Sequence, residues 1–167
     1  MRILAIDPGY DRCGVAVVEA AAQPAVLFSA CITTQKSENH ATRLATVYEG
    51  LEAICKQWNP DTLALETLFF SINKTTALKV AEARGVALLL AGVRSLPVIE
   101  LSPQEVKLAM TGIGNASKAQ IQKMVQLSMK IYTKEKIDDE IDAIALGVAA
   151  IQKARVDNFE KRLANKK

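Results

Sequence analysis

Residues 1–10 read Met-Arg-Ile-Leu-Ala-Ile-Asp-Pro-Gly-Tyr, a short apolar run followed by an acid and a turn signal. The run from Ile3 to Ile6 is too short for a stable helix, and the dipeptide after Asp7 is typical of a turn, so this stretch predicts a buried strand that ends at Asp7. A second apolar run, Leu63-Ala-Leu65, leads in the same way into Glu66. We therefore expect two buried strands, each with a carboxylate at its carboxyl end.

An apolar helix near the end of the sequence begins with two further acids, Asp139 and Asp142. Residues three apart on a helix share one face, so both carboxylates can reach the same point. Ionised carboxylates gathered in an apolar setting repel one another and lose hydration, at a cost of several kcal/mol per ion. A divalent cation would compensate this cost.

The candidate metal ligands are all oxygen donors: Asp7, Glu66, Asp139 and Asp142. A donor set without His or Cys favours Mg²⁺ or Mn²⁺ over zinc. Four carboxylates can hold two such ions roughly 4 Å apart, the arrangement that cleaves phosphodiesters by activating a water and stabilising the leaving oxygen. Asp138 lies four residues before Asp142 and is the alternative to Asp139 as a ligand.

Each acid also has a simpler explanation. Asp7 precedes Pro-Gly and could only initiate a turn, and Asp139 could only cap a helix whose first turn favours anions. One metal site explains all four acids together, and we prefer it for that reason.

The remaining pattern predicts an α/β fold with a five-stranded mixed sheet, three antiparallel strands followed by two parallel ones, and helices on both faces. The fourth strand follows a helix, so a right-handed crossover should place it beside the first strand. The expected strands are 3–7, 13–19, 25–34, 62–66 and 98–101, and the expected helices are 41–58, 75–96, a short one after Ser102-Pro103, one from Ser117, and 138–155.

A chain of 167 residues with this pattern predicts one domain, which we place at residues 1–155, followed by a basic C-terminal tail at 156–167. The tail is expected to be frayed or to extend the last helix into solvent. Three cysteines without Cys-x-x-Cys spacing are typical of buried thiols in a reducing compartment. The apolar stretch 86–93 is far shorter than the ~20 residues that span a bilayer. We expect a cytoplasmic protein that does not enter a membrane.

Charge is unevenly distributed along the chain. Residues 74–136 carry 10 basic and 4 acidic side chains, whereas the charged residues within 137–142 are all acidic. This layout suits a polyanion lying across a basic surface with metal at one acidic spot beneath it. Ordinary solvated helix faces would explain part of the same pattern.

Several short motifs occur along residues 1 to about 150. In order they are Asp7-Pro-Gly, Glu66-Thr-Leu-Phe69 with Asn73, Glu82-Ala-Arg-Gly-Val86, Lys107 and Lys118 flanking Thr111-Gly, and Asp139-x-x-Asp142-Ala-Ile-Ala. Together and in this order they resemble the RuvC family of Holliday junction resolvases. The resemblance implies a ribonuclease H-like fold, a homodimer, and Mg²⁺-dependent symmetric nicking of two strands of a four-way DNA junction in recombination and repair. It also implies a RuvA–RuvB branch-migration complex as partner.

The resemblance further implies roles for individual residues. Asp7, Glu66, Asp139 and Asp142 would be the catalytic metal-binding acids, and Lys107 and Lys118 would assist near the scissile phosphate. Phe69 would contact or stack on bases at the opened crossover, and base stacking is worth about 1 to 3 kcal/mol. The expected DNA-contacting residues are Phe69, Phe70, Asn73, Lys74, Lys107, Lys118 and Lys123.

Two other classes of protein remain as alternatives. One is a junction-binding protein without catalysis, which the presence of all four acids disfavours. The other is a phosphotransferase of the actin and sugar-kinase superfamily, whose first strand also ends in Asp before a Gly-bearing turn. With 167 residues the chain is too short for the two duplicated lobes of that superfamily.

Overall fold

The computed structural model describes residues 1–67, 74–129 and 138–164 of the chain. These segments form five strands and five helices, close to the predicted bounds. In order they are β1 (Arg2–Asp7), β2 (Arg12–Glu19), β3 (Ala25–Thr33), α1 (His40–Trp58), β4 (Thr62–Glu66), α2 (Lys74–Val93), β5 (Val98–Leu101), α3 (Pro103–Thr111), α4 (Lys118–Met129) and α5 (Asp138–Ala164).

The strands form one sheet in the order β3-β2-β1-β4-β5. The pairs β1–β2 and β2–β3 are antiparallel, while β4 is parallel to β1 and β5 is parallel to β4. The predicted mixed sheet is therefore confirmed, including the crossover that places β4 beside β1. Because β1 and β4 are parallel neighbours, their carboxyl ends lie at the same edge of the sheet.

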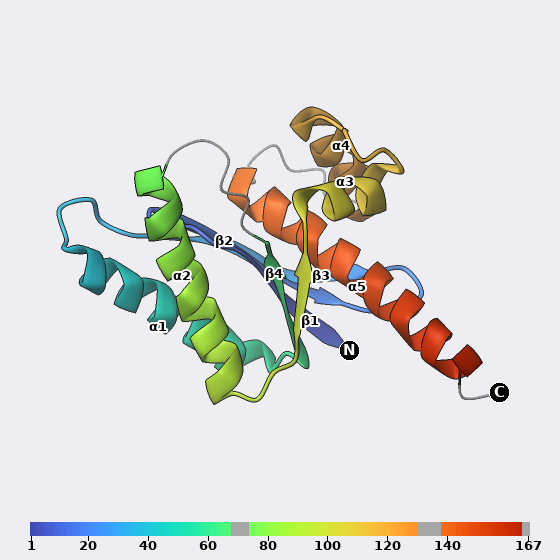
Figure 1. The fold of residues 1–167 in the computed structure, drawn as a ribbon, viewed down its shortest axis with the longest axis horizontal. Helices are drawn as coiled ribbons and strands as arrows, with labels where there is room; N and C mark the ends of the chain where they lie inside the picture. The colour runs from blue at the N-terminus through green and yellow to red at the C-terminus, as the bar shows by residue number, and fades with distance from the viewer. Residues whose placement is uncertain (68–73, 130–137, 165–167) are drawn as a thin grey trace.

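Strict alternation along the central strands separates two cores. Leu4 and Ile6 of β1 pack with α1 and α2 on one face of the sheet, whereas Ile3 and Ala5 pack with α3, α4 and α5 on the other. Figure 1 shows α1 and α2 side by side against the sheet, with α5 crossing the opposite face. The helices thus cover both faces, as predicted, because each central strand is apolar on both of its sides.

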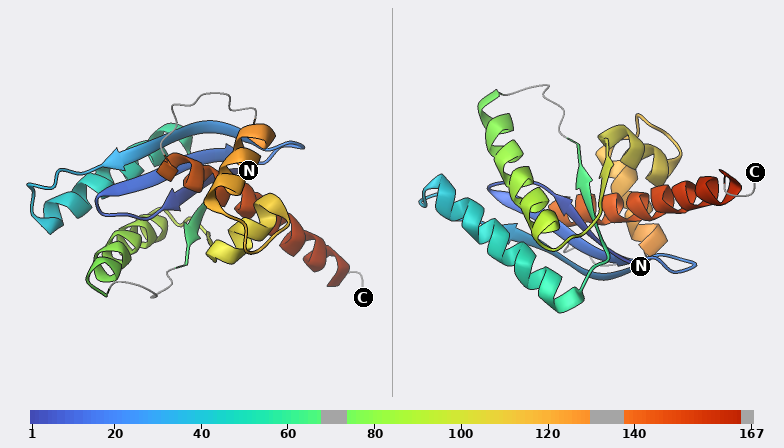
Figure 2. Two further views of the ribbon diagram at one scale, coloured as in Figure 1. Left: turned by 90° about the horizontal axis from the view of Figure 1, so that it is seen from above. Right: turned by 60° about the horizontal axis from the view of Figure 1, so that its bottom comes forward.

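The last helix is longer than predicted. It was expected to end near Arg155, but it continues as helix to Ala164, and its side chains from Arg155 to Arg162 are exposed. Figure 2 shows these last turns extending beyond the sheet. The tail at 156–167 was expected either to be frayed or to extend the last helix into solvent. Its described part, up to Ala164, extends the helix into solvent. Among the described residues, no helix has the length and apolar character needed to cross a bilayer.

Candidate active site

The two strand-end acids lie side by side. In the β1–β4 register Ile6 faces Leu65, so Asp7 and Glu66 follow as the next residue on each strand. Alternation places both side chains on the α5 face, because Ala5 and Ala64, two residues before them, belong to that core. The sheet therefore brings together two carboxylates that are distant in sequence.

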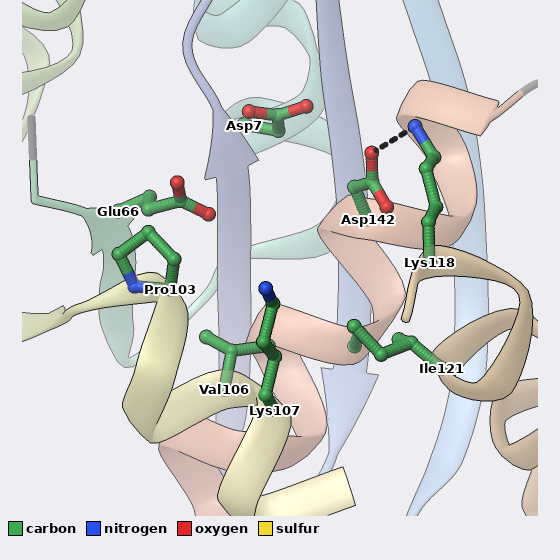
Figure 3. A pocket seen from close by; sticks show the side chains of 9 residues that line it. Asp7, Glu66, Pro103, Val106, Lys107, Lys118, Ile121 and Asp142 are labelled. Atoms are coloured by element: carbon green, nitrogen blue, oxygen red, sulfur yellow. Dashed lines mark hydrogen bonds and ion pairs between the residues drawn. The ribbon is translucent and has the colours of Figure 1, made fainter. Parts of the chain in front are cut away.

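The first turns of α5 bring Asp142 to the same place. A cavity of about 300 Å³ is lined by all three acids, by two lysines and by apolar residues from α3, α4 and α5: Asp7, Glu66, Pro103, Val106, Lys107, Lys118, Ile121, Asp142 and Ala145. Figure 3 shows the carboxylates of Asp7, Glu66 and Asp142 around one hollow, with the Lys107 amine pointing into it. Three of the four predicted acids and both predicted lysines thus line one cavity.

The acids of β1 and β4 are strongly perturbed. Burial, followed by repulsion from Asp142 and Asp139, raises the pKa of Asp7 to about 6. Burial, followed by repulsion from Asp7 and Asp142, raises the pKa of Glu66 to about 7. Burial and repulsion thus disfavour the charged form of both carboxyl groups, which is the electrostatic condition expected at a functional site.

Two lysines supply part of the missing positive charge. Lys118 Nζ donates a hydrogen bond to Asp142 Oδ2 at 2.9 Å and lies 3.7 Å from Asp138 Oδ2. The bond to Asp142 raises the pKa of Lys118. Lys107 lies near Glu66 and partly offsets the rise in the pKa of that carboxyl group. Lys107 is carried by α3, whose start is fixed by a capping box between Ser102 and Glu105 directly after β5.

Asp139 does not line the cavity. Its Oδ2 atom is paired with the Arg12 guanidinium and accepts a hydrogen bond from the Cys31 thiol at 3.6 Å. The charge of Asp139 still repels that of Asp7 and contributes to the raised pKa of Asp7. Asp138, the alternative ligand, is 65% exposed and faces Lys118.

Gly14 explains how α5 comes so close to the sheet. It faces Asp7 across β1–β2 and Cys31 across β2–β3. A Cβ atom built on Gly14 would lie 2.1 Å from the carbonyl oxygen of Asp139. The absence of a side chain at this position therefore allows the acid-bearing turn of α5 to rest on the strand beside Asp7.

The other predicted DNA-contacting residues lie away from the cavity or outside the described residues. Lys123 is exposed on α4 and does not line the cavity. Lys74 begins α2. The predictions for Phe69, Phe70 and Asn73 fall outside the described residues.

Sequence reasoning missed Arg12, Cys31 and Gly14. Arg12 lies just before the strand expected at 13–19 and received no role. Cys31 was expected to be buried like the other cysteines, but it is only half-buried. The small residue Gly14 inside a Val-rich strand was the available signal, because glycine in a strand often marks a close approach of another backbone.

The chemistry of the donor set fits a divalent cation. The cavity presents carboxylate oxygens with raised pKa values, and no His or Cys side chain is among its lining residues. As the side chains lie, however, no three acidic, His or Cys groups within residues 1–67, 74–129 and 138–164 are close enough to share an ion. Asp142 is engaged by Lys118 and Asp139 by Arg12, so both pairs would have to loosen for these acids to bind a metal.

Known proteins of one family resemble this chain over most of its length. The family model described as crossover junction endodeoxyribonuclease RuvC matches residues 3–150. The crossover junction endodeoxyribonuclease RuvC of Moorella thermoacetica is 43% identical over 167 residues, covering 99% of this chain and all of the relative. That of Thermomicrobium roseum is 39% identical over 161 residues, covering 96% and 99%.

A solved structure of Thermus thermophilus RuvC in complex with a Holliday junction substrate superposes with a TM-score of 0.88 at 26% identity, covering 94% of this chain and 96% of that one. The ribonuclease H-like fold implied by the motifs is thereby confirmed. With the family model matching most of the chain, these comparisons establish that the chain belongs to the RuvC family of crossover junction endodeoxyribonucleases.

Proposed function

We propose that the cavity between β1, β4, α3, α4 and α5 is the catalytic centre with which this chain resolves Holliday junctions, by nicking two DNA strands symmetrically. The observation that carries the assignment is that Asp7, Glu66 and Asp142 line one cavity with Lys107 and Lys118. Membership of the RuvC family supports the reaction, and the T. thermophilus relative with its Holliday junction substrate supports the DNA structure. The process served would be homologous recombination and DNA repair.

Asp7, Glu66 and Asp142, with Asp139 after release from Arg12, would hold divalent ions, two Mg²⁺ per site with Mn²⁺ as a substitute. When bound, such ions supply a nucleophilic water at neutral pH and charge stabilisation at the attacking and leaving oxygens. The raised pKa values of Asp7 and Glu66 support this assignment, because a bound cation would offset the burial and the repulsion that raise them.

The two cavity lysines would act on the phosphate. Lys107 directs its amine into the hollow, where it can donate to a phosphate oxygen and stabilise the charge that grows in the transition state. Lys118 would hold Asp142 in place before metal and DNA arrive, and then move from the carboxylate to the phosphate. Both lysines would therefore be catalytic residues.

DNA binding would extend beyond the cavity. Lys123 is exposed on the same helix as Lys118 and would contact backbone phosphates without reading sequence. The opened crossover would be contacted by the residues that the family resemblance implies for this role: Phe69, Phe70, Asn73 and Lys74. Binding through phosphates predicts a strong dependence on salt, because each contact releases condensed counterions.

The chain would act as a homodimer through α2. The outward face of this helix carries large apolar and small residues at helical spacing, including Leu78, Gly85, Leu89, Gly92 and Val93, and the three large ones are 60–65% exposed. A Cβ atom on either glycine would meet nothing within 4 Å, so packing within the chain does not require a small residue there. Since glycine inside a helix costs about 0.5 to 1 kcal/mol relative to alanine, close packing of a second copy would explain both positions.

The RuvA–RuvB branch-migration complex would deliver the junction to this dimer. Family membership is the support for this partner.

Cleavage of a synthetic four-way junction by the purified chain, with Mg²⁺ or Mn²⁺, tests the proposed function. We expect paired nicks at symmetric positions with 5′-phosphate and 3′-hydroxyl ends, and no cleavage by a folded Asp7→Asn variant. Binding of the junction without cleavage, together with no uptake of metal in calorimetry, would instead indicate a binding protein. Binding of ATP would indicate a phosphotransferase.

A further inference from the structure

Arg84 connects α2 to the backbone of a proposed metal-binding acid. Its Nε atom donates a hydrogen bond to the carbonyl oxygen of Glu66 at 3.2 Å, and its Nη2 atom donates to Glu100 Oε2 on β5 at 2.6 Å. The Arg84 side chain is 17% exposed. A mostly buried guanidinium that donates to a backbone carbonyl and to a carboxylate has little freedom to move.

Arg84 approaches Glu66 from the face of the sheet opposite the cavity. Its neighbours Ala87 and Leu90 on α2 pack in the core on the α1 side, whereas the Glu66 side chain points to the α5 side. Arg84 therefore touches neither the cavity nor the carboxylate. It acts on the carbonyl that follows the Glu66 Cα atom.

The orientation of that carbonyl bears on the direction in which the Glu66 side chain leaves the backbone. The peptide group is planar, and β4 before Glu66 is held by its pairing with β1. With that side held, fixing the carbonyl of Glu66 restricts its ψ angle and so the direction of its Cα–Cβ bond. On the other side of this peptide, the Thr67 N–H donates to the carbonyl of Leu101 at 2.9 Å. Hydrogen bonds from α2 and to β5 thus hold both polar atoms of the peptide that ends β4.

We propose that Arg84 is a positioning residue that sets the direction of the Glu66 side chain toward the metal ions, and that it links this acid to the helix proposed as the dimer surface. Arg84 belongs to the run Glu82-Ala-Arg-Gly-Val86, which contributed to the family resemblance without receiving a role. The inference rests on the proposed function, because Glu66 matters in this way only as a metal ligand.

The test compares Arg84→Met with a matched control, Arg94→Met. Arg94 lies just beyond the end of the same helix and donates to both carboxylate oxygens of Glu52 at 2.7 Å, with 26% of its side chain exposed. Each substitution removes one positive charge and one partly buried ion pair. Only Arg84 contacts Glu66, so a general loss of stability or charge should affect both variants alike.

Mn²⁺ affinity of the full-length protein, measured by calorimetry without DNA, is the main readout. Kinetics of junction cleavage is the second. We expect Arg84→Met to weaken Mn²⁺ binding and lower kcat by about 10- to 100-fold, the usual effect of removing a group that orients a metal ligand, with KM for the junction unchanged. Arg94→Met should keep wild-type affinity and kcat. Wild-type values for Arg84→Met, or equal losses in both variants, would overturn the proposal.

A double-mutant cycle locates the effect. In the Glu66→Gln background, Arg84→Met should change Mn²⁺ affinity less than twofold, whereas a further tenfold loss would show that Arg84 acts elsewhere. If Arg84→Met does not fold, Arg84→Lys replaces it. A lysine cannot span both acceptors, so at least a threefold loss of Mn²⁺ affinity is expected, and unchanged affinity would refute the role.

The experiments distinguish a failure of the proposed function from a failure of the proposed role of Arg84. A wild-type chain that binds Mn²⁺ but leaves four-way junctions intact would refute the nuclease, while the metal titrations would still decide the role of Arg84. Normal cleavage by the wild type and by Arg84→Met would refute the role of Arg84 alone.

Discussion

Lys118 Nζ lies 2.9 Å from Asp142 Oδ2, so a lysine of α4 forms an ion pair with one of the acids that are proposed to bind metal. The two side chains are 57% and 31% exposed, which keeps this ion pair weak enough to be exchanged for another partner. The same site therefore contains a positive charge that competes with the metal ion for Asp142.

Replacing Lys118 should separate metal binding from cleavage. In Lys118→Met the competing cation is gone, so Mn²⁺ affinity should stay equal or increase, while cleavage falls at least tenfold because the phosphate loses a charged donor. Calorimetry and single-turnover cleavage measure the two effects. Lys123→Met on the same helix should weaken junction binding without lowering the single-turnover rate at saturation. A wild-type cleavage rate in Lys118→Met would contradict the role of this lysine.

The pKa values of Asp7 and Glu66 predict how stability depends on pH. Both are raised above their unfolded values of roughly 4, to about 6 and about 7. The folded metal-free protein thus holds more protons than the unfolded chain, and stability should fall as pH rises from 4 to 7. One pKa unit corresponds to about 1.4 kcal/mol. Over this pH range the two groups together should lower the free energy of unfolding by on the order of a few kcal/mol.

Thermal unfolding at pH 5 and pH 8 checks this prediction. With a chelator present, the wild type should have the lower Tm at pH 8, and Mg²⁺ or Mn²⁺ should restore it. Asp7→Asn removes one repelling charge, so its Tm at pH 8 without metal should exceed that of the wild type although cleavage is lost. A wild-type Tm that rises from pH 5 to pH 8 in chelator would contradict the raised pKa values of Asp7 and Glu66.

Gly14→Ala should disturb the acid-bearing turn of α5. The added methyl group would collide with the carbonyl of Asp139, and overpacking of this kind typically costs 1 to 3 kcal/mol. We expect a lower free energy of unfolding in urea and at least tenfold slower cleavage. Gly114→Ala, which places its methyl group in open space, should change stability by less than about 0.5 kcal/mol. Equal behaviour of the two variants would argue against a close approach at Gly14.

The proposed dimer can be tested with one exposed leucine on α2 and one on α4. Leu89 is 60% exposed and Leu127 is 61% exposed, so exchanging either for Glu should have a similar small effect on the folded monomer. Leu89→Glu should convert a dimer into a monomer in sedimentation equilibrium, because a charge would be buried without a partner in the contact. Leu127→Glu should remain dimeric. Loss of the dimer in Leu127→Glu alone would move the contact to α4.

Much of the fold follows from local pattern. Short apolar runs that end in Asp7 and Glu66 indicated strands with acids at their carboxyl ends, and a helix was expected at 41–58, between the first and fourth of the expected strands. The same pattern indicated that β4 should lie parallel to β1, because a helix connects them. From these steps the sequence predicted that Asp7 and Glu66 meet at one edge of the sheet. The end of α5 was less predictable, since a polar helix that extends into solvent has no apolar periodicity to mark its length.

The sequence by itself determined which elements form, their order, and which acids can converge, because side-chain alternation and helical spacing are properties of neighbouring residues. Only the tertiary structure decided which cation meets which acid: Lys118 with Asp142, Arg12 with Asp139, and Arg84 with the Glu66 carbonyl. Each of these contacts joins different helices and strands, so it depends on how closely they pack. The spacing of residues along the chain does not determine how closely these elements pack.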